Sequence, residues 1–330
     1  MIVDKPLLEL EQYKPALTRQ PDFDVFWERS LIESAKQPLH SVSEKIAYPV
    51  EQVSVYHVQY DGFGPNTRIS GWYIVPKHRQ HFGSEGRTPT IMQYHGYSGG
   101  KGLPGSYLHW AAQGYCVFTV DTRGQGGDTP DNAHYQSGGA VGFMTKGIDD
   151  PTTYYYRYAY MDCVRALEVA RSFTEVGPIF VTGGSQGGGL TLAVAALVQD
   201  KGIAGAMVDY PFLCHVERSL ELFTDGPYHE LVHLWKRLPF AVQKHLRTLS
   251  YFDGMNIAPR ISYPVLLSVG LLDTVCPPST AFAVYNHLLS VEKQIAVYPY
   301  NGHEGGGAVH DEEKYRFVRR CLSQVENAAN

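Results

Sequence analysis

Short apolar segments alternate with longer helical patterns over most of the chain, and this alternation constrains the fold more than any other feature. The apolar segments lie at 90–94, 115–120, 178–182, 204–208, 264–269 and 294–298. The helical patterns lie at 106–113, 154–173, 185–199, 279–290 and 311–325. Near-continuous apolar strands separated by helices predict an α/β fold: a mostly parallel sheet with helices on both faces.

Two further regions complete this organisation. Residues 22–38 have the spacing of an amphipathic helix, and residues 51–60 and 68–76 alternate like two antiparallel strands. Residues 212–253 interrupt the alternation and read as mostly helical, so we predict a cap or lid inserted above the edge of the sheet. We expect one α/β domain spanning residues 1–330.

Composition excludes several classes of function. The 330 residues carry 28 Lys and Arg against 33 Asp and Glu, which leaves no basic excess for a nucleic-acid partner. The five cysteines are scattered and never in C-x-x-C spacing, which disfavours a disulfide framework or a zinc knuckle and fits a reducing compartment. Asp4 and Lys5 interrupt any apolar run at the N-terminus. We therefore expect a soluble cytoplasmic protein without a signal peptide or membrane contact.

The most informative motif is residues 183–187 (GGSQG), between a predicted strand and a predicted helix. In the G-x-S-x-G arrangement such a turn exposes a nucleophilic serine at the edge of the sheet. The glycines leave room for the sharp turn, and the helix N-terminus supplies N–H groups where an oxyanion forms. Ser185 could instead be a helix N-cap, a common role of serine. The strand and helix around it favour the nucleophile.

A nucleophilic serine needs a base to take its proton and an acid to orient that base. In this type of sheet the chain order is Ser, Asp or Glu, then His. Asp273 and His303 follow the last two predicted strands, so both leave the same sheet edge as Ser185. Asp209 is a rival acid, Asp273 could be a helix N-cap, and His303 could be a solvated histidine. Position and order favour the triad Ser185, Asp273 and His303.

Two N–H donors are needed to stabilise an oxyanion. One candidate is the backbone N–H of Gln186, directly after the nucleophile. The other comes from the glycine-rich loop at residues 94–100 (YHGYSGG), and within it we choose Tyr97. The alternative for this loop is a plain glycine-rich turn.

The motifs together resemble a known family. Residues 123–125 (RGQ), 183–187 (GGSQG) and 303–304 (HE) resemble the RGQ, GxSQG and HE motifs of the acetyl xylan esterase / cephalosporin-C deacetylase family, carbohydrate esterase family seven. Segments 142–168 and 211–218 are also similar to that family. The resemblance covers most of the chain, and three motifs in order are more specific than G-x-S-x-G alone.

This resemblance implies an α/β-hydrolase fold and hydrolysis of acetyl esters on xylo-oligosaccharides and cephalosporin C. It implies a cytoplasmic homo-oligomer, commonly a hexameric ring, with a small acetylated substrate and without metal or cofactor. Carried over to this sequence, Ser185 is the nucleophile, Asp273 the acid and His303 the base. Tyr97 and Gln186 are the oxyanion donors.

Other functions remain to be compared with this one. A broader short-chain carboxylesterase or a peptidase of the same fold would use the same residues, because a fold does not set the substrate. A non-catalytic binding protein on this scaffold would be expected to lack a member of the triad, and all three members are present. Metal-dependent hydrolysis is disfavoured because we expect no H-x-x-x-H ligand pair near the proposed site.

Three conspicuous features have simpler interpretations. A guanidinium at Arg123 can tie loops together through bidentate contacts, so we predict a structural role for it. Glu304, beside His303, is expected to order its loop and not to act as a second base. Tyrosines 154–156 could stack on sugars, but their helical spacing favours a place in the core or at an interface.

Overall fold

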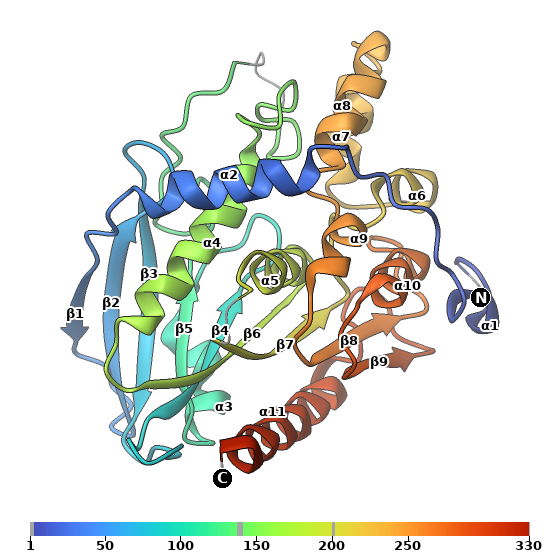
Figure 1. Ribbon diagram of the computed structural model, residues 1–330. Coiled ribbons are helices and arrows are strands. Elements are labelled where there is room, and N and C mark those ends of the chain that lie inside the picture. The colour runs from blue at the N-terminus through green and yellow to red at the C-terminus, as the bar shows by residue number, and fades with distance from the viewer. Residues whose placement is uncertain (1–2, 137–140, 200–201, 330) are drawn as a thin grey trace.

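A computed structural model describes residues 3–136, 141–199 and 202–329. Within these residues, nine strands form one sheet in the order β1-β2-β3-β5-β4-β6-β7-β8-β9 (Figure 1). The strands are β1 Val42–Ile46, β2 Val53–Asp61, β3 Arg68–Pro76, β4 Thr88–Tyr94, β5 Cys116–Val120, β6 Val176–Gly184, β7 Ile203–Asp209, β8 Val265–Gly270 and β9 Lys293–Tyr298.

The helices alternate with these strands. They are α1 Leu7–Leu10, α2 Phe23–Ala35, α3 Leu108–Ala111, α4 Tyr155–Arg171, α5 Gln186–Leu197, α6 Val216–Leu222, α7 Tyr228–Trp235, α8 Val242–Leu249, α9 Gly254–Ile257, α10 Pro278–His287 and α11 Gly307–Ala329. Short 3₁₀ helices are η1 Pro104–Tyr107, η2 Pro239–Ala241 and η3 Ala258–Arg260. None of the helices in the described residues is long and apolar enough to cross a bilayer.

The pairing directions match the sequence prediction. Strands β4 to β9 pair in parallel. Strands β1, β2 and β3 form an antiparallel extension that joins the sheet at β5. Strand β1 is missing from the prediction, because its sequence VSEKI is mostly exposed and lacks an apolar face. A solvated edge strand of this kind gives no alternation signal.

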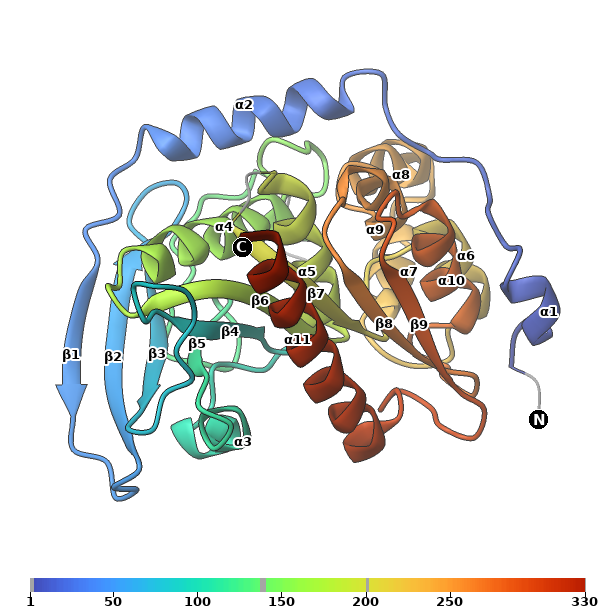
Figure 2. The same cartoon turned by 60° about the horizontal axis from the view of Figure 1, so that its bottom comes forward.

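Helices cover both faces of the sheet (Figure 2). In β6, the adjacent residues Phe180 and Val181 are both fully buried but belong to different cores. Phe180 lies in the cluster with Trp110 of α3 and Phe317 of α11. Val181 lies in the larger cluster, which includes apolar residues of α2, α4, α5, α9 and α10. Burial on both faces explains why the parallel strands are apolar throughout.

The carboxyl ends of the parallel strands meet at one edge, and this edge positions the site. The registers align the last residues of neighbouring strands: Tyr94 with Gly183, Gly184 with Asp209, and Gly270 with Tyr298. The loops that follow β4, β6, β7, β8 and β9 therefore leave the sheet side by side. These loops carry Tyr97, Ser185, Asp273 and His303, while Asp209 ends β7 and Gln186 begins α5.

Some element boundaries differ from the predicted ones. The helix expected at 185–199 begins at Gln186, with Ser185 left in the turn. The helix expected at 106–113 is divided into η1 and α3, and α11 extends further at both ends than 311–325. The segment 212–253 is helical as expected and contains α6, α7, η2 and α8.

Candidate active site

Ser185 occupies the turn between β6 and α5 in a strained conformation. Its backbone has φ 56° and ψ −120°, a conformation that residues other than glycine rarely adopt. Three backbone hydrogen bonds hold it there: its N–H donates to the Asp209 carbonyl at 3.0 Å, and its carbonyl accepts from Gly189 at 3.1 Å and Phe212 at 2.9 Å. The surrounding backbone therefore holds the side chain of Ser185 out of the helix.

The flanking glycines are required by close backbone contacts. A Cβ on Gly183 would lie 2.6 Å from the carbonyl carbon of Gly187. A Cβ on Gly187 would overlap the carbonyl oxygen of Tyr94, at the end of β4. Because these neighbours are backbone atoms, they cannot move aside as a flexible side chain could. This crowding is the physical reason for the motif at 183–187.

The structure brings Ser185, His303 and Asp273 together. His303 Nε2 lies 2.9 Å from Ser185 Oγ, and His303 Nδ1 lies 2.9 Å from Asp273 Oδ2. The Asp273 side chain has no exposed surface, and its other oxygen accepts the N–H groups of Val275 and Cys276 at 2.8 Å each. A carboxylate held in this way keeps the proton on Nδ1, which leaves Nε2 as the acceptor facing the serine hydroxyl.

Asp209, the rival acid, faces elsewhere. Its carboxylate accepts from His310 Nε2 at 2.9 Å and from Lys314 Nζ at 3.0 Å, both on α11. Burial raises the pKa of Asp209, but the charge of Lys314 and the hydrogen bond from His310 outweigh burial and leave the pKa below its usual value. Asp209 thus serves the Ser185 turn through its backbone carbonyl, not through its side chain.

The two predicted oxyanion donors come from the loop after β4 and from the start of α5. Gln186 is the first residue of α5, so its N–H has no acceptor within the helix. Within the described residues, the backbone N–H of Tyr97 donates to no protein acceptor. The phenol of Tyr97 is engaged instead: it donates to Glu230 Oε1 at 2.6 Å and accepts from the Phe143 N–H at 2.9 Å. The backbone N–H of Tyr97 is therefore the donor of this residue that is left for a substrate oxygen.

Part of this site lines a cavity of about 680 Å³. Ser185, His303 and Tyr97 contribute to its wall, together with Gly226, Pro227 and Glu230 from the segment 212–253. The cavity is large enough for a small ester.

Sequence reasoning missed two residues of this wall. Glu230 bonds to Tyr97, and burial raises the pKa of its carboxyl group despite hydrogen bonds from Tyr97 and Met144. The Tyr210 ring packs edge-on against the His303 ring, with centroids 5.0 Å apart, and burial raises its pKa to about 12. Tyr210 could have been found because it follows a strand at the carboxyl edge, but nothing in the sequence distinguishes Glu230 from other charges of the insertion.

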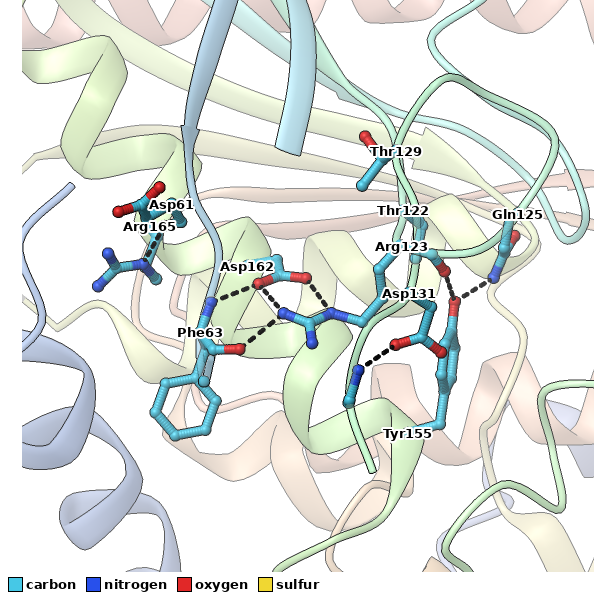
Figure 3. Close-up of polar contacts among 12 residues, drawn as sticks. Asp61, Phe63, Thr122, Arg123, Gln125, Thr129, Asp131, Tyr155, Asp162 and Arg165 are labelled. Atoms are coloured by element: carbon cyan, nitrogen blue, oxygen red, sulfur yellow. Dashed lines mark hydrogen bonds and ion pairs between the residues drawn. The ribbon is translucent and has the colours of Figure 1, made fainter. Parts of the chain in front are cut away.

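Arg123 has the structural role predicted for it (Figure 3). Its Nε and Nη2 each lie 2.7 Å from an oxygen of Asp162 on α4, and Nη2 also donates to the Phe63 carbonyl at 2.7 Å. Both charged side chains are buried. The pair joins the loop after β5 to α4 and to the turn between β2 and β3.

The remaining features also have the simpler interpretation. Tyrosines 154–156 are all buried in the core, with at most 1% of each exposed, so their rings do not present a surface to sugars. Glu304 is exposed and accepts from Asn301 Nδ2 at 2.9 Å and from the Gly302 N–H at 3.1 Å, which orders the loop before α11.

The expectation that no H-x-x-x-H pair lies near the site is wrong, because His229 and His233 on α7 flank Glu230 of the cavity wall. Among the described residues, however, no three His, Cys, Asp or Glu side chains are grouped to hold a metal ion.

Comparisons with known proteins show the family of this chain. A family profile described as "Acetyl xylan esterase (AXE1)" matches residues 1–321. The chain is similar to a solved acetyl xylan esterase from Paenibacillus sp. R4, with a TM-score of 0.90, 45% identity, and coverage of 96% of this chain and 99% of that one. It is also similar to acetyl xylan esterase 1 from Thermoanaerobacterium sp. JW/SL YS485, with a TM-score of 0.88, 32% identity, and the same coverage of both chains.

A curated relative is the acetyl esterase Axe7A of Xylanibacter ruminicola, 29% identical over 304 residues that make up 89% of this chain. The chain spans 65% of the length of that relative. The two solved acetyl xylan esterases share the architecture of this chain over 99% of their own length. The chain therefore belongs to the acetyl xylan esterase family and has the α/β-hydrolase fold.

Proposed function

We propose that this protein is a serine esterase that removes acetyl groups from acetylated xylo-oligosaccharides, with cephalosporin C as a further substrate. Membership of the family indicates a carboxylic ester hydrolase. The observation that carries the proposal is the chain of two 2.9 Å contacts from Ser185 through His303 to Asp273, at the wall of a cavity. In this proposal the segment 212–253 is a cap that shapes the pocket around the leaving alcohol.

The mechanism is a two-step acyl transfer. His303 takes the proton of Ser185 as the serine oxygen attacks the acetyl carbonyl carbon, and the charged His303 ring is stabilised by Asp273. The N–H groups of Tyr97 and Gln186 donate to the oxyanion. His303 then gives its proton to the departing sugar oxygen, which leaves an acetyl group on Ser185. Water attacks that ester with His303 again as base, and acetate is released.

Ser185→Ala tests the assignment of the nucleophile. We expect the variant to fold, because the backbone hydrogen bonds of Ser185 with Asp209, Gly189 and Phe212 hold the turn and do not involve its hydroxyl. Turnover of nitrophenyl acetate should fall by several orders of magnitude, and labelling by a fluorophosphonate should disappear. Full esterase activity in this variant would reject the proposal. Labelling of the unaltered protein also excludes a non-catalytic binding protein.

Acyl-chain length tests the substrate class. We would compare nitrophenyl acetate, butyrate and octanoate, with Ser185→Ala as the blank. A steep decline after acetate indicates a small acyl pocket and leads to acetylated xylo-oligosaccharides and cephalosporin C as the next substrates. A flat or rising profile indicates a broader carboxylesterase, and cleavage of amides indicates a peptidase. Activity that survives a chelator argues against metal-dependent hydrolysis.

We further propose a cytoplasmic homo-oligomer, with the hexamer implied by the family resemblance as the expected size. All five cysteines lie in the described residues, and each is a buried free thiol, which supports a reducing compartment. Light scattering on the purified protein measures the oligomer size. A monomer would reject this part of the proposal and leave the esterase activity untouched.

A further inference from the structure

The side chain of Gln125 lies between the two loops that carry the oxyanion donors. Its carboxamide forms a reciprocal pair with that of Gln186: Gln125 Nε2 donates to Gln186 Oε1 at 2.9 Å, and Gln186 Nε2 donates to Gln125 Oε1 at 3.0 Å. The same Gln125 Oε1 accepts the backbone N–H of Ser98 at 2.9 Å. One side chain thus contacts the residue after Tyr97 and the residue after the nucleophile.

Both contacted segments depend on strained backbone. Ser98 has φ 58° and Ser185 has φ 56°, so the residue that follows one donor and the residue that precedes the other are both left-handed. Such conformations cost about 1–3 kcal/mol and persist only where neighbouring groups hold them. The side-chain oxygen of Gln125 accepts the N–H of Ser98 directly. Its contact with the turn at Ser185 is indirect, through the side chain of Gln186.

Gln125 is itself held in place. Its Nε2 donates to the hydroxyl of Tyr155 at 3.0 Å, and that hydroxyl donates to the carbonyl of Arg123 at 2.6 Å (Figure 3). Arg123 is fixed in turn by its ion pair with Asp162. The partner Gln186 is 1% exposed, and its Oε1 also accepts from Tyr156 at 3.1 Å. The amide pair therefore connects the oxyanion loops to two tyrosines of the core.

We propose that Gln125 is a positioning residue for the oxyanion hole: its amide sets the separation between the N–H groups of Tyr97 and Gln186. This inference rests on the proposed esterase function and adds to it a residue that touches neither substrate nor the reacting atoms. Oxyanion donors act only when they meet the developing charge at hydrogen-bond distance. A shift of about 1 Å between two donors is enough to cost about 100-fold in rate.

The test uses Gln125→Met, which keeps the length of the side chain and removes its hydrogen bonds. We expect kcat for nitrophenyl acetate to fall about 10- to 100-fold, with KM changed less than about 3-fold. The affinity for a trifluoromethyl ketone, whose adduct with Ser185 carries an oxyanion, should fall by the same factor as kcat. Gln125→Glu retains the acceptor for Ser98 and loses the donor to Gln186, so its kcat should lie between those of Gln125→Met and the unaltered protein.

Two controls separate positioning from folding. Tyr155→Phe removes one anchor of Gln125 but leaves the amide pair and the bond to Ser98, so kcat should fall less than it does in Gln125→Met. Active-site titration with a fluorophosphonate expresses kcat per competent site, which a merely destabilised protein would leave unchanged. The variant is expected to fold because the loop that carries Gln125 is also joined to the loop that carries Tyr97, by a hydrogen bond from the Gly126 N–H to the Gly99 carbonyl at 2.8 Å.

A double-mutant cycle completes the test. Gln186→Met breaks the same amide pair from the other side, so the double variant should lose less than the product of the two single losses. Multiplicative losses would overturn the proposal. It would also be overturned by an unchanged kcat in Gln125→Met, or by a kcat loss without loss of ketone affinity. If Ser185→Ala abolishes turnover and Gln125→Met does not change it, the esterase function stands and only the role of Gln125 is removed.

Discussion

Arg123 and Asp162 face each other through two parallel hydrogen bonds of 2.7 Å, and neither side chain has more than 2% of its surface exposed. Removal of one partner from a buried pair leaves the other charge without compensation, at a cost of about 3–5 kcal/mol. We predict that Arg123→Met lowers the free energy of unfolding by this amount, measured by urea denaturation. Arg123→Lys should not rescue it, because an ammonium group cannot form the bidentate contact.

The control for this prediction is an exposed ion pair. Arg316 contacts Glu313 at 2.6 Å, but both side chains are about half exposed or more. Arg316→Met should therefore change the free energy of unfolding by less than about 1 kcal/mol. Equal effects of the Arg123 and Arg316 substitutions would contradict the importance given to the buried pair.

A second prediction concerns the glycine after the nucleophile turn. Gly187→Ala places a Cβ against the carbonyl of Tyr94, so the turn must open or β4 must move. We expect a loss of about 1–3 kcal/mol in stability and a fall in fluorophosphonate labelling of Ser185. Gly96→Ala is the matched control, because its Cβ would meet nothing closer than the Gly184 carbonyl at 3.9 Å. Similar behaviour of the two variants would count against the steric account of the motif.

A third prediction follows from the buried carboxylate of Asp209. Its pKa lies below the usual 3.8, so the stability that it contributes is present above pH 3.8 and is lost as the pH falls through the lower folded value. The pKa of Lys314 lies above its usual 10.5. The stability that its charge contributes is therefore fully present below pH 10.5 and is lost as the pH rises through the higher folded value. Urea denaturation of Asp209→Asn should show a deficit of about 3–5 kcal/mol between these limits, which shrinks in acid.

Lys314 also provides the control for that measurement. It contacts Asp311 at 2.8 Å, and the Asp311 side chain is 42% exposed. Asp311→Asn should cost less than about 1 kcal/mol, since solvent screens the exposed pair. A deficit in Asp209→Asn that stays constant down to pH 2 would show that its carboxylate does not contribute in the manner described.

A fourth prediction separates the two ends of Tyr97. Tyr97→Phe removes the hydroxyl that bonds to Glu230 and Phe143 but leaves the backbone N–H assigned to the oxyanion. We expect stability to fall by about 1–3 kcal/mol, because polar groups of Glu230 and Phe143 lose their partner, while kcat stays within about 3-fold. Tyr300→Phe, with 90% of the residue exposed, should change neither quantity. A large loss of kcat in Tyr97→Phe would mean that the hydroxyl itself takes part in the reaction.

The parallel part of the sheet could be predicted well, because a strand that is buried on both faces has a continuous run of apolar residues. Phe180 and Val181 illustrate this: neighbours in β6, they enter opposite cores, and both must be apolar. Strand β1 has no such apolar run, because it pairs with β2 along one edge only and its side chains are mostly exposed. Helix boundaries differ from the predicted ones by a few residues, because apolar spacing does not mark the terminal residue of a helix.

The candidate triad could be predicted because chain order and strand ends place three residues at one edge. The choice between Asp273 and Asp209 was harder, since both follow strands of that edge. What separates them in space is the approach of His310 and Lys314 from α11, a tertiary contact that strand pattern alone does not encode. Glu230 and the amide pair of Gln125 with Gln186 were missed for the same reason.

The site residues are far apart along the chain, so the reactivity of Ser185 reports whether the strands between them have paired. Ser185 and His303 are 118 residues apart and belong to the loops after β6 and β9, so their contact requires β7, β8 and β9 to have paired in register. Helices such as α4 and α5 form from local contacts, whereas pairing of distant strands is slow. During refolding, helical circular dichroism should therefore recover first, and covalent capture of Ser185 should appear only when β6, β7, β8 and β9 have paired.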